Sequence, residues 1–346
     1  MTKVLDLPAL RTRHLLELLG TGKRLVVMTH NNPDPDSLAS AMGLRLLAEQ
    51  VARIPSCFAM RGDILRAENK AMVRLLQVDM VSAATEPIVA SDLIALVDTQ
   101  PGFGHTVVPQ DHPVDIVVDH HEGPREAGHA PPRFVDLRIE AGATSSIVAS
   151  YLMESGVEVP ARVATALFYG IRTDTADLAR NASPLDEKAY HFLAPRIDRR
   201  IIAEISNPDV PVDYFRALRK AMNTTRIYGH VVLCSLGATE NPEMVAEVAD
   251  LLLRLEGKTW VIAGGLYRDT YYVSVRTDGM TGREAWHILA DAIQDVGSFG
   301  GHGAVAGGRV KLATPSPRAL GRLERKLQKR ILESLGVAHL PPTTLA

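Results

Sequence analysis

Short apolar runs alternate with amphipathic segments over the first 205 residues of the chain. Buried strands are predicted where apolar residues follow one another, at 25–28, 92–97, 114–118 and, with a more mixed pattern, 55–60. Apolar residues recur at helical spacing in other segments, which predicts helices at about 9–20, 38–53, 66–77, 143–153, 161–168 and 186–204. Strands that alternate with helices favour a parallel sheet joined by right-handed crossovers.

The pattern changes near residue 206. Two prolines, Pro208 and Pro211, fall within the segment 206–213, and we interpret 206–223 as a linker that includes a connecting helix. Farther along, strands are predicted at 228–236, 258–267 and 270–277, and helices at about 241–255, 281–295 and 316–335. We therefore predict an α/β protein of two domains, a larger one at 1–205 and a smaller one at 224–346.

Composition narrows the class of protein. The 346 residues are 46% hydrophobic and 23% charged, which is typical of a globular protein, and the net charge of −2 does not indicate nucleic acid or a membrane as a partner. Cys57 and Cys234 lie far apart, so neither a disulfide framework nor a zinc–thiolate site is expected. The first 20 residues do not read as a signal peptide, and no apolar run reaches the length of about 20 residues that a membrane helix needs. We expect a cytoplasmic protein.

Polar side chains follow three of the predicted strands and one apolar segment farther along the chain. They are His30, Asp34 and Asp36 after the first strand, Asp98 after the second, Asp119, His120 and His121 after the third, and Asp174 near the helix 161–168. Because the carboxyl ends of parallel strands lie at one edge of a sheet, we expect these imidazoles and carboxylates to converge. Taken singly, each aspartate also fits a turn or a helix cap.

The set of ligands indicates a particular kind of metal site. Carboxylate and imidazole groups without thiolates suit Mn²⁺, Mg²⁺ or Fe²⁺ better than structural zinc. The candidate groups outnumber the positions around one ion, so we predict two divalent cations about 3.5–4 Å apart and bridged by one carboxylate. Such a pair activates water to hydroxide and stabilises the oxygens of a phosphoryl displacement.

A glycine-rich segment at 297–308 contains six glycines among its twelve residues. A loop of this composition lets backbone N–H groups approach an anion closely, so we predict an anion-binding loop here.

These motifs, in this order, resemble the DHH phosphoesterase family of the RecJ-like superfamily. The N-terminal part of the resemblance consists of H-x-N-P-D-x-D at 30–36, Asp98, D-H-H at 119–121 and G-x-x-T-D-T at 170–175. The strand 273–276 and the Gly300-Gly301-His302 triplet resemble the C-terminal DHHA1 domain of that family. The most similar subgroup is the nano-RNase/pAp phosphatase type. The resemblance implies a parallel-sheet DHH domain with flanking helices and a smaller DHHA1 domain with a mixed sheet, with the active site in the cleft between them.

The resemblance also implies roles for individual residues. His30 and Asp34 would bind the first metal, Asp36, His120 and Asp174 the second, and Asp98 would bridge the two. Asp119 would orient an imidazole, and His121 would face the scissile phosphate. The nucleotide would be held by Arg276, Gly300, Gly301 and His302.

The implied reaction is metal-dependent hydrolysis of phosphodiester or phosphomonoester bonds in short oligoribonucleotides, pAp, or linear or cyclic dinucleotides. The alternatives are an exopolyphosphatase- or pyrophosphatase-like hydrolase and a catalytically weak nucleotide sensor. The sensor hypothesis depends on Pro35 and Ala39, which replace two glycines usual in the first motif. A homodimer is expected only from its general frequency among proteins.

Overall fold

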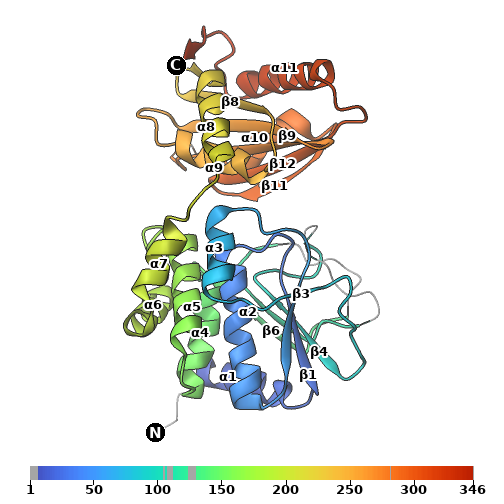
Figure 1. Cartoon of the computed structure of the whole chain (residues 1–346), viewed down its shortest axis with the longest axis vertical. Helices are drawn as coiled ribbons and strands as arrows, with labels where there is room; N and C mark the ends of the chain where they lie inside the picture. The colour runs from blue at the N-terminus through green and yellow to red at the C-terminus, as the bar shows by residue number, and fades with distance from the viewer. Residues whose placement is uncertain (1–6, 104–105, 107–111, 124–129, 281, 346) are drawn as a thin grey trace. The chain divides into compact units, whose positions relative to one another are not determined.

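The computed structural model describes residues 7–103, 106, 112–123, 130–280 and 282–345. The chain divides into two compact units, Met1–Pro208 and Asp209–Ala346 (Figure 1). Each unit has its own sheet and its own hydrophobic clusters, and each is described by itself.

The first unit is built on a six-stranded sheet in which every neighbouring pair of strands is parallel. The strand order is β3-β2-β1-β4-β5-β6, with β1 at Arg24–Met28, β2 at Ser56–Met60, β3 at Val81–Ser82, β4 at Asp92–Val97, β5 at Ile116–Asp119 and β6 at Phe134–Leu137. The parallel sheet is confirmed. The strands β3 and β6 were not predicted, because β3 has two residues and β6 has only four, one of which is Asp136.

The helices of the first unit depart from the expected bounds in two places. They are α1 (Leu7–Leu19), α2 (Pro35–Leu47, followed by a π-helical turn at Ala48–Ala52), α3 (Ala67–Leu75), α4 (Thr144–Ser155), α5 (Ala161–Asp174), α6 (Pro184–Leu193) and α7 (Arg199–Ser206). The single helix predicted at 186–204 is wrong, because a 3₁₀ turn at Ala194–Arg196 follows α6 and the Asp198 side chain caps a new helix. The helix predicted to end at 168 continues to Asp174.

Close packing of α5 against α2 brings the end of α5 to the start of α2. A Cβ atom on Gly170 of α5 would lie 2.5 Å from Ser145 Oγ, 3.1 Å from Asp36 Cα and 3.2 Å from Ala39 Cβ. Ala39 is fully buried, so its methyl group fills space at this contact between the two helices. The absence of a side chain at Gly170 therefore decides how near Asp174 lies to Asp36.

The second unit has a seven-stranded mixed sheet in the order β11-β12-β10-β9-β8-β7-β13. Its strands are β7 (Arg226–Tyr228), β8 (Val231–Ala238), β9 (Trp260–Tyr267), β10 (Thr270–Thr277), β11 (Ser298–His302), β12 (Val305–Lys311) and β13 (Thr343–Thr344). The helices α8 (Val212–Thr224) and α9 (Glu243–Leu252) pack on one face, and α10 (Ala285–Ile293) and α11 (Pro317–Ser334) pack on the other. Only β8 and β9 pair in parallel within the described part of this sheet.

The glycine-rich segment at 297–308 is not the loop that its composition suggests. It forms most of an antiparallel hairpin of β11 and β12, in which Gly300 pairs with Gly307 and Gly301 with Ala306. Gly301 and Gly308 are required by close packing: a Cβ on Gly308 would lie 2.5 Å from Ile293 Cδ1 of α10, and one on Gly301 would lie 2.4 Å from the carbonyl oxygen of Val305.

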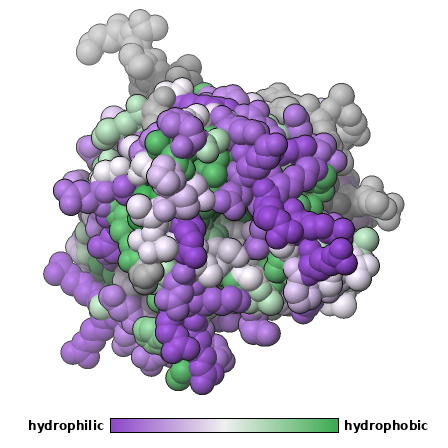
Figure 2. All heavy atoms as spheres, turned by 90° about the horizontal axis from the view of Figure 1, so that it is seen from above, coloured by the Kyte–Doolittle hydropathy of each residue, from purple (hydrophilic) through white to green (hydrophobic). Residues whose placement is uncertain are grey.

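Among the described residues, no helix has both the length and the apolar composition that crossing a bilayer requires. Hydrophilic side chains cover most of the face seen in Figure 2, with apolar residues showing between them.

Candidate metal centre and substrate-binding face

The carboxyl ends of β1, β4 and β5 meet at one edge of the parallel sheet. His30 follows β1, Asp98 follows β4, and Asp119 ends β5 directly before His120 and His121. As expected from the apolar pattern, residues that are far apart in sequence are thereby brought to one place.

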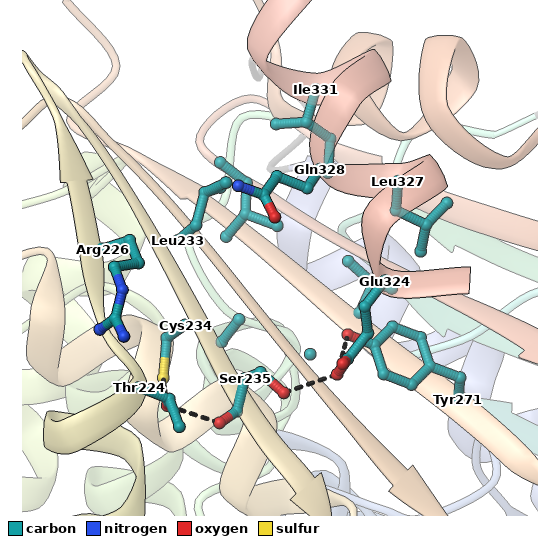
Figure 3. A pocket seen from close by; sticks show the side chains of 14 residues that line it. Thr224, Arg226, Leu233, Cys234, Ser235, Tyr271, Glu324, Leu327, Gln328 and Ile331 are labelled. Atoms are coloured by element: carbon teal, nitrogen blue, oxygen red, sulfur yellow. Dashed lines mark hydrogen bonds between the residues drawn. The ribbon is translucent and has the colours of Figure 1, made fainter. Parts of the chain in front are cut away.

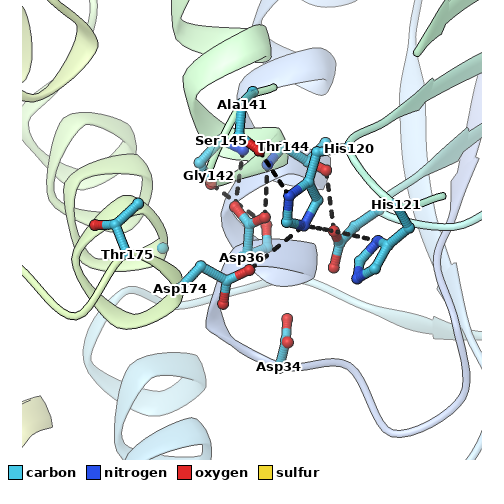
Figure 4. Close-up of polar contacts among 12 residues, drawn as sticks. Asp34, Asp36, His120, His121, Ala141, Gly142, Thr144, Ser145, Asp174 and Thr175 are labelled. Atoms are coloured by element: carbon cyan, nitrogen blue, oxygen red, sulfur yellow. Dashed lines mark hydrogen bonds and ion pairs between the residues drawn. The ribbon is translucent and has the colours of Figure 1, made fainter. Parts of the chain in front are cut away.

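Two helices bring further carboxylates to the same edge (Figure 4). The Asp34 side chain caps α2 by accepting a hydrogen bond of 2.9 Å from the Ser37 N–H. Pro35 occupies the first helical position, where its fixed φ favours a helix start and its missing N–H costs nothing. Asp36 therefore lies in the first turn of α2, and Asp174 is the last residue of α5.

The possible ligand atoms form three overlapping groups, and within each group they lie within 4.8 Å of one another. The groups are His30, Asp34 and Asp98; Asp98, His120 and His121; and Asp36, His120 and Asp174. Asp98 and His120 each belong to two groups, so neighbouring groups share a side chain. His120 Nε2 lies 3.5 Å from Asp174 Oδ2 and 3.6 Å from Asp98 Oδ1.

Asp98 is held tightly at the centre of this cluster. Its φ of 58° lies in the left-handed region, which residues other than glycine rarely adopt. Ser37 Oγ donates to Asp98 Oδ2 at 2.6 Å, and Thr144 Oγ1 donates to Oδ1 at 2.9 Å. Oδ2 also lies 3.6 Å from Nε2 of His30. The two oxygens of one carboxylate thus face imidazoles from two different strands.

Asp36 is fully buried and is oriented by the start of α4. Its two oxygens accept backbone N–H groups of Thr144 at 2.7 Å and Ser145 at 2.8 Å. Free N–H groups at a helix N-terminus favour an anion, so α4 stabilises the ionised form of this buried carboxylate.

His120 is oriented so that one nitrogen has a free lone pair. Its Nδ1 lies 3.1 Å from the carbonyl oxygen of Ala141, and a carbonyl pairs only with a donor, so Nδ1 carries the proton. Nε2 is buried and has no hydrogen-bond partner in the described part of the chain. A buried nitrogen lone pair directed toward Asp98 and Asp174 is the arrangement that a metal ligand requires.

His121 is oriented by Asp119, which is fully buried. Asp119 Oδ1 accepts from His121 Nδ1 at 2.8 Å, and Oδ2 accepts from the Gln100 amide at 2.8 Å. The carboxylate also accepts the backbone N–H of His120 at 2.8 Å. Asp119 thus fixes the His121 ring.

The carboxylates of this edge shift one another's pKa values. Burial lowers the pKa of His30, but hydrogen bonding to Asp98 and the charges of Asp34 and Asp98 outweigh it and raise that pKa to about 9. Burial, together with neighbouring carboxylates, raises the pKa values of Asp36 and Asp174 well above the usual range. In the described residues, no Lys or Arg side chain forms an ion pair with these four aspartates. Crowded carboxylates that have imidazoles but no Lys or Arg as partners create a strong demand for further positive charge.

Divalent cations fit this site. The donors are carboxylate oxygens and imidazole nitrogens, a set that suits Mn²⁺, Mg²⁺ or Fe²⁺. The unpaired Nε2 of His120 and the shared positions of His120 and Asp98 fit ions that are held by overlapping sets of ligands.

Arg276 lies on β10 of the second unit and is largely buried. Its guanidinium contacts Asp250 of α9 through Nε and donates from Nη1 to Ser274 Oγ at 2.7 Å and to the Val275 carbonyl at 3.1 Å. The sequence did not indicate Asp250 as its partner. These contacts fix the side chain on the face of the sheet on which α9 packs.

The other residues expected to bind substrate lie in the neighbouring hairpin. Gly300 pairs with Gly307, and a Cβ atom on either of them would meet nothing within 4 Å. Gly301 adopts a φ of 148°, which a side chain disfavours. His302 pairs with Val305 beside the turn, but its side chain lies outside the described part of the structure.

A cavity of about 140 Å³ lies on the opposite face, between the sheet and α11 (Figure 3). Ser235 Oγ and Tyr271 Oη both donate to Glu324 Oε1 there, at 2.5 and 3.3 Å. Gly264 leaves room for Tyr271, because a Cβ on Gly264 would overlap the hydroxyl oxygen. This cavity holds none of the residues expected to bind a substrate.

Residues 24–171 match the family model described as the DHH family, N-terminal domain. This segment is a DHH-family domain. It includes the DHH triplet itself, Asp119-His120-His121, at the carboxyl end of β5. The resemblance proposed for this part of the chain is confirmed.

Relatives in sequence align with most of the chain. Uncharacterized protein MJ1633 of Methanocaldococcus jannaschii is 34% identical over 320 residues, which cover 90% of this chain and 64% of the relative. Cyclic-di-AMP phosphodiesterase GdpP of Geobacillus thermodenitrificans is 26% identical over 337 residues, covering 92% of this chain and 48% of the relative. The chain therefore spans about half to two thirds of the length of these relatives.

A solved structure shares the fold of the DHH domain and of the unit that follows it. The exopolyphosphatase-related protein from Bacteroides fragilis superposes with a TM-score of 0.75 at 17% identity, covering 97% of this chain and 99% of that one. At this identity the likeness concerns the fold: a parallel-sheet unit followed by a unit with a mixed sheet.

Several residues that support the DHH site were not among the predicted site residues. Ser37 and Thr144 hold Asp98, and Ser145 and Thr144 hold Asp36. Gln100 holds Asp119. The available signal was positional: Thr144 and Ser145 begin a predicted helix, where free N–H groups occur.

Proposed function

We propose that the chain is a metal-dependent phosphoesterase that hydrolyses phosphate esters of small nucleotides. The observation that carries the proposal is the set of three ligand groups that share Asp98 and His120 at one sheet edge. In this proposal His30 and Asp34 bind one divalent cation, Asp36, His120 and Asp174 bind a second, and Asp98 bridges the pair. Two divalent cations, with Mn²⁺ the expected metal, supply Lewis-acid activation of water and neutralise charge on the phosphoryl oxygens.

The chain's own side chains have separate tasks in this reaction. Asp98 is kept in position by the hydroxyls of Ser37 and Thr144, so its carboxylate stays fixed where two of the ligand groups meet. His121, with Nδ1 bound to Asp119, is placed to give a proton to the leaving oxygen through Nε2. Burial lowers the pKa of His121, but the hydrogen bond to Asp119 and nearby carboxylates outweigh it and raise that pKa to about 9.

The second unit supports the choice of a nucleotide as substrate. Arg276 and the open glycine pair Gly300 and Gly307 offer a guanidinium and accessible backbone to a phosphate. The similarity to a cyclic-di-AMP phosphodiesterase favours the same class of substrate. The replacements in the first motif do not argue for a catalytically weak sensor, because Pro35 starts α2 and Ala39 packs against Gly170 while the ligand groups stay together.

The proposal is tested by a substrate panel with purified protein and Mn²⁺. The panel contains pAp, a 5′-phosphorylated linear dinucleotide, a cyclic dinucleotide, pyrophosphate, polyphosphate and bis-p-nitrophenyl phosphate. We expect turnover of at least one nucleotide with a kcat/KM well above that for pyrophosphate and polyphosphate. Preference for pyrophosphate or polyphosphate would replace the nucleotide proposal, and nucleotide binding without any turnover would favour a sensor.

A further inference from the structure

One short segment of the first unit orients two ligands of the second proposed cation. This segment, 141–145, leads into α4 (Figure 4). The carbonyl oxygen of Ala141 lies 3.1 Å from His120 Nδ1, and the N–H groups of the first two residues of α4 donate to the two oxygens of Asp36. Whatever fixes this segment therefore fixes two of the three side chains in that ligand group.

The third ligand, Asp174, ends α5 shortly before a strained turn. Ala176, Asp177 and Leu178 have φ values of 48°, 61° and 66°, which residues other than glycine rarely adopt, least of all in succession. Backbone in this conformation persists only where the surrounding structure holds it. The chain on the carboxyl side of Asp174 therefore needs an anchor.

Asp186 joins the two segments. It lies in the first turn of α6 and is fully buried. Its Oδ2 accepts the N–H of Gly142 at 2.8 Å, and it also accepts the N–H and the hydroxyl of Ser183 at 2.7 and 2.6 Å. One carboxylate oxygen thus ties the segment that leads into α4 to the chain that follows the strained turn.

Capping of α6 does not account for all of these contacts. A capping box uses two reciprocal hydrogen bonds, and both are present between Ser183 and Asp186. The hydrogen bond from Gly142 is a further contact that the cap does not need. Asp186 Oδ1 is buried and has no hydrogen-bond partner among the described residues, which costs stability that an exposed cap would keep. The burial of this carboxylate therefore indicates a role besides capping.

Gly142 brings the same two segments into direct contact. A Cβ atom on Gly142 would lie 2.6 Å from Thr175 Cγ2 and 2.8 Å from the carbonyl oxygen of Asn181. Thr175 is fully buried and directly follows Asp174. The chain before α4 and the chain after α5 are thus packed together with no side chain between them, at the point where Asp186 accepts its hydrogen bond.

We propose that Asp186 is a positioning residue, which holds the ligands of the second cation at the spacing that the cation requires. It belongs to none of the ligand groups, and it acts through Gly142 on the segment that orients Asp36 and His120. This role rests on the proposed function, to which it adds a supporting residue outside the ligand groups. Loss of the hydrogen bond between Gly142 and Asp186 should weaken the second cation site and leave substrate contacts unchanged.

The test measures Mn²⁺ binding without substrate, by isothermal titration calorimetry of wild type, Asp186→Ala and Asp186→Asn. In Asp186→Ala we expect the Kd of one of the two ions to rise about tenfold, the lower end of the loss seen when a group that orients a metal ligand is removed. The other ion should bind within about twofold of wild type. Asp186→Asn keeps an acceptor for Gly142 but loses the charge, so its Kd should rise less, about threefold. If Asp186→Ala does not fold, the Kd of Asp186→Asn decides in the same way.

Asp198→Ala serves as the control, because Asp198 caps α7 in the same unit and lies outside the ligand groups. Loss of a helix cap should lower the Tm of both alanine variants, measured with EDTA present. Only Asp186→Ala should change the affinity for Mn²⁺. Comparison of the two variants therefore separates positioning of the ligands from a general loss of stability.

Kinetics adds a readout that a purely structural role does not change. In Asp186→Ala the Mn²⁺ concentration that gives half-maximal kcat should rise about tenfold, while KM for a nucleotide at saturating Mn²⁺ stays within about twofold. Unchanged Mn²⁺ affinity in both Asp186 variants, equal weakening of both ions, or a wild type that binds only one ion overturns the positioning role. If wild type binds two Mn²⁺ ions but hydrolyses no phosphate ester, the proposed reaction fails, and the calorimetry still decides the role of Asp186.

Discussion

His120 Nε2 lies 3.6 Å from Asp98 Oδ1, although the two residues follow different strands of the parallel sheet. The contact exists because β4 and β5 are parallel neighbours in register, so both chains leave the sheet at one edge. It also joins two of the three ligand groups, since both residues are shared. The predictions below test whether this shared geometry performs the proposed chemistry.

Asp98→Asn should remove activity without unfolding the protein. In the proposed site Asp98 bridges both cations, so we expect kcat to fall about a thousandfold or more. The side-chain shape is kept, and an amide oxygen still accepts a hydrogen bond from Ser37 or Thr144. Steady-state kinetics at saturating Mn²⁺ measures the loss, and circular dichroism reports the fold.

The matched control is Asp79→Asn. Asp79 is exposed on the same unit and lies outside the ligand groups. It should keep full activity. A wild-type kcat in Asp98→Asn would contradict the bridging role and the two-cation assignment with it.

Removal of divalent cations should destabilise the first unit as well as stop turnover. Buried carboxylates repel one another, and a cation bound at a concentration of 100 times its Kd stabilises the folded state by about 2.7 kcal/mol. For a unit of this size that corresponds to a fall in Tm of roughly 5–10 °C after chelation. Differential scanning calorimetry with EDTA, and then with Mn²⁺ added back, measures the shift. The same shift in Asp98→Asn would mean that the cation binds elsewhere.

Arg276→Ala should weaken nucleotide binding selectively. Loss of a charge-assisted contact to phosphate should raise KM for pAp about tenfold, with little change for bis-p-nitrophenyl phosphate. Asp250→Asn is the informative companion, because it removes the ion pair that holds Arg276 but keeps the guanidinium. We expect a smaller rise in KM for this variant. An equal effect of Arg276→Ala on KM for both substrates would show that Arg276 does not bind the nucleotide selectively.

The topology of the first unit could be predicted because its apolar strands are short and continuous and because helices follow β1 and β2, although β3 to β6 follow one another without a described helix between them. The same pattern suffices to predict that His30, Asp98 and His120 share one edge of the sheet. The strand pattern does not suffice to place Asp34, Asp36 and Asp174, because their positions depend on where helices begin and end. Asp174 comes into place only because α5 continues past 168 and Gly170 lets it lie against α2.

The glycine-rich segment shows where composition misleads. Glycine is common in loops, and nothing local distinguishes a loop from strands whose glycines are required by neighbours. The reasons here are tertiary: Ile293 of α10 lies where a side chain on Gly308 would be, and Val305 lies against Gly301. In the same way, the partner of Arg276 is on α9, 26 residues earlier, and no spacing rule identifies Asp250.

His121→Asn should affect substrates according to their leaving group. A general acid helps a poor leaving group, such as a nucleoside alkoxide, far more than p-nitrophenolate, which leaves without a proton. We expect kcat to fall about 10²–10³-fold for a dinucleotide and less than about tenfold for bis-p-nitrophenyl phosphate. Asp119→Asn should show the same selectivity with a smaller loss, about 10–100-fold, because it disturbs the orientation of the ring. Equal losses for both substrates would indicate that His121 acts in binding.

Gly170→Ala tests whether helix packing sets the metal centre. The new methyl group would lie 2.5 Å from Ser145 Oγ of α4 and 3.1 Å from Asp36 Cα of α2, so α5 must move away from these two helices. We expect a loss of about 1–3 kcal/mol in the free energy of unfolding and weaker cation binding, because Asp174 moves with α5. Gly321→Ala on α11 is the control, since its methyl group makes only an ordinary contact of 3.4 Å with Arg325. Calorimetry and Mn²⁺ titration measure both effects, and Ser145→Ala in the same chain should restore part of each. Unchanged Mn²⁺ affinity in Gly170→Ala would show that the position of Asp174 does not depend on this contact.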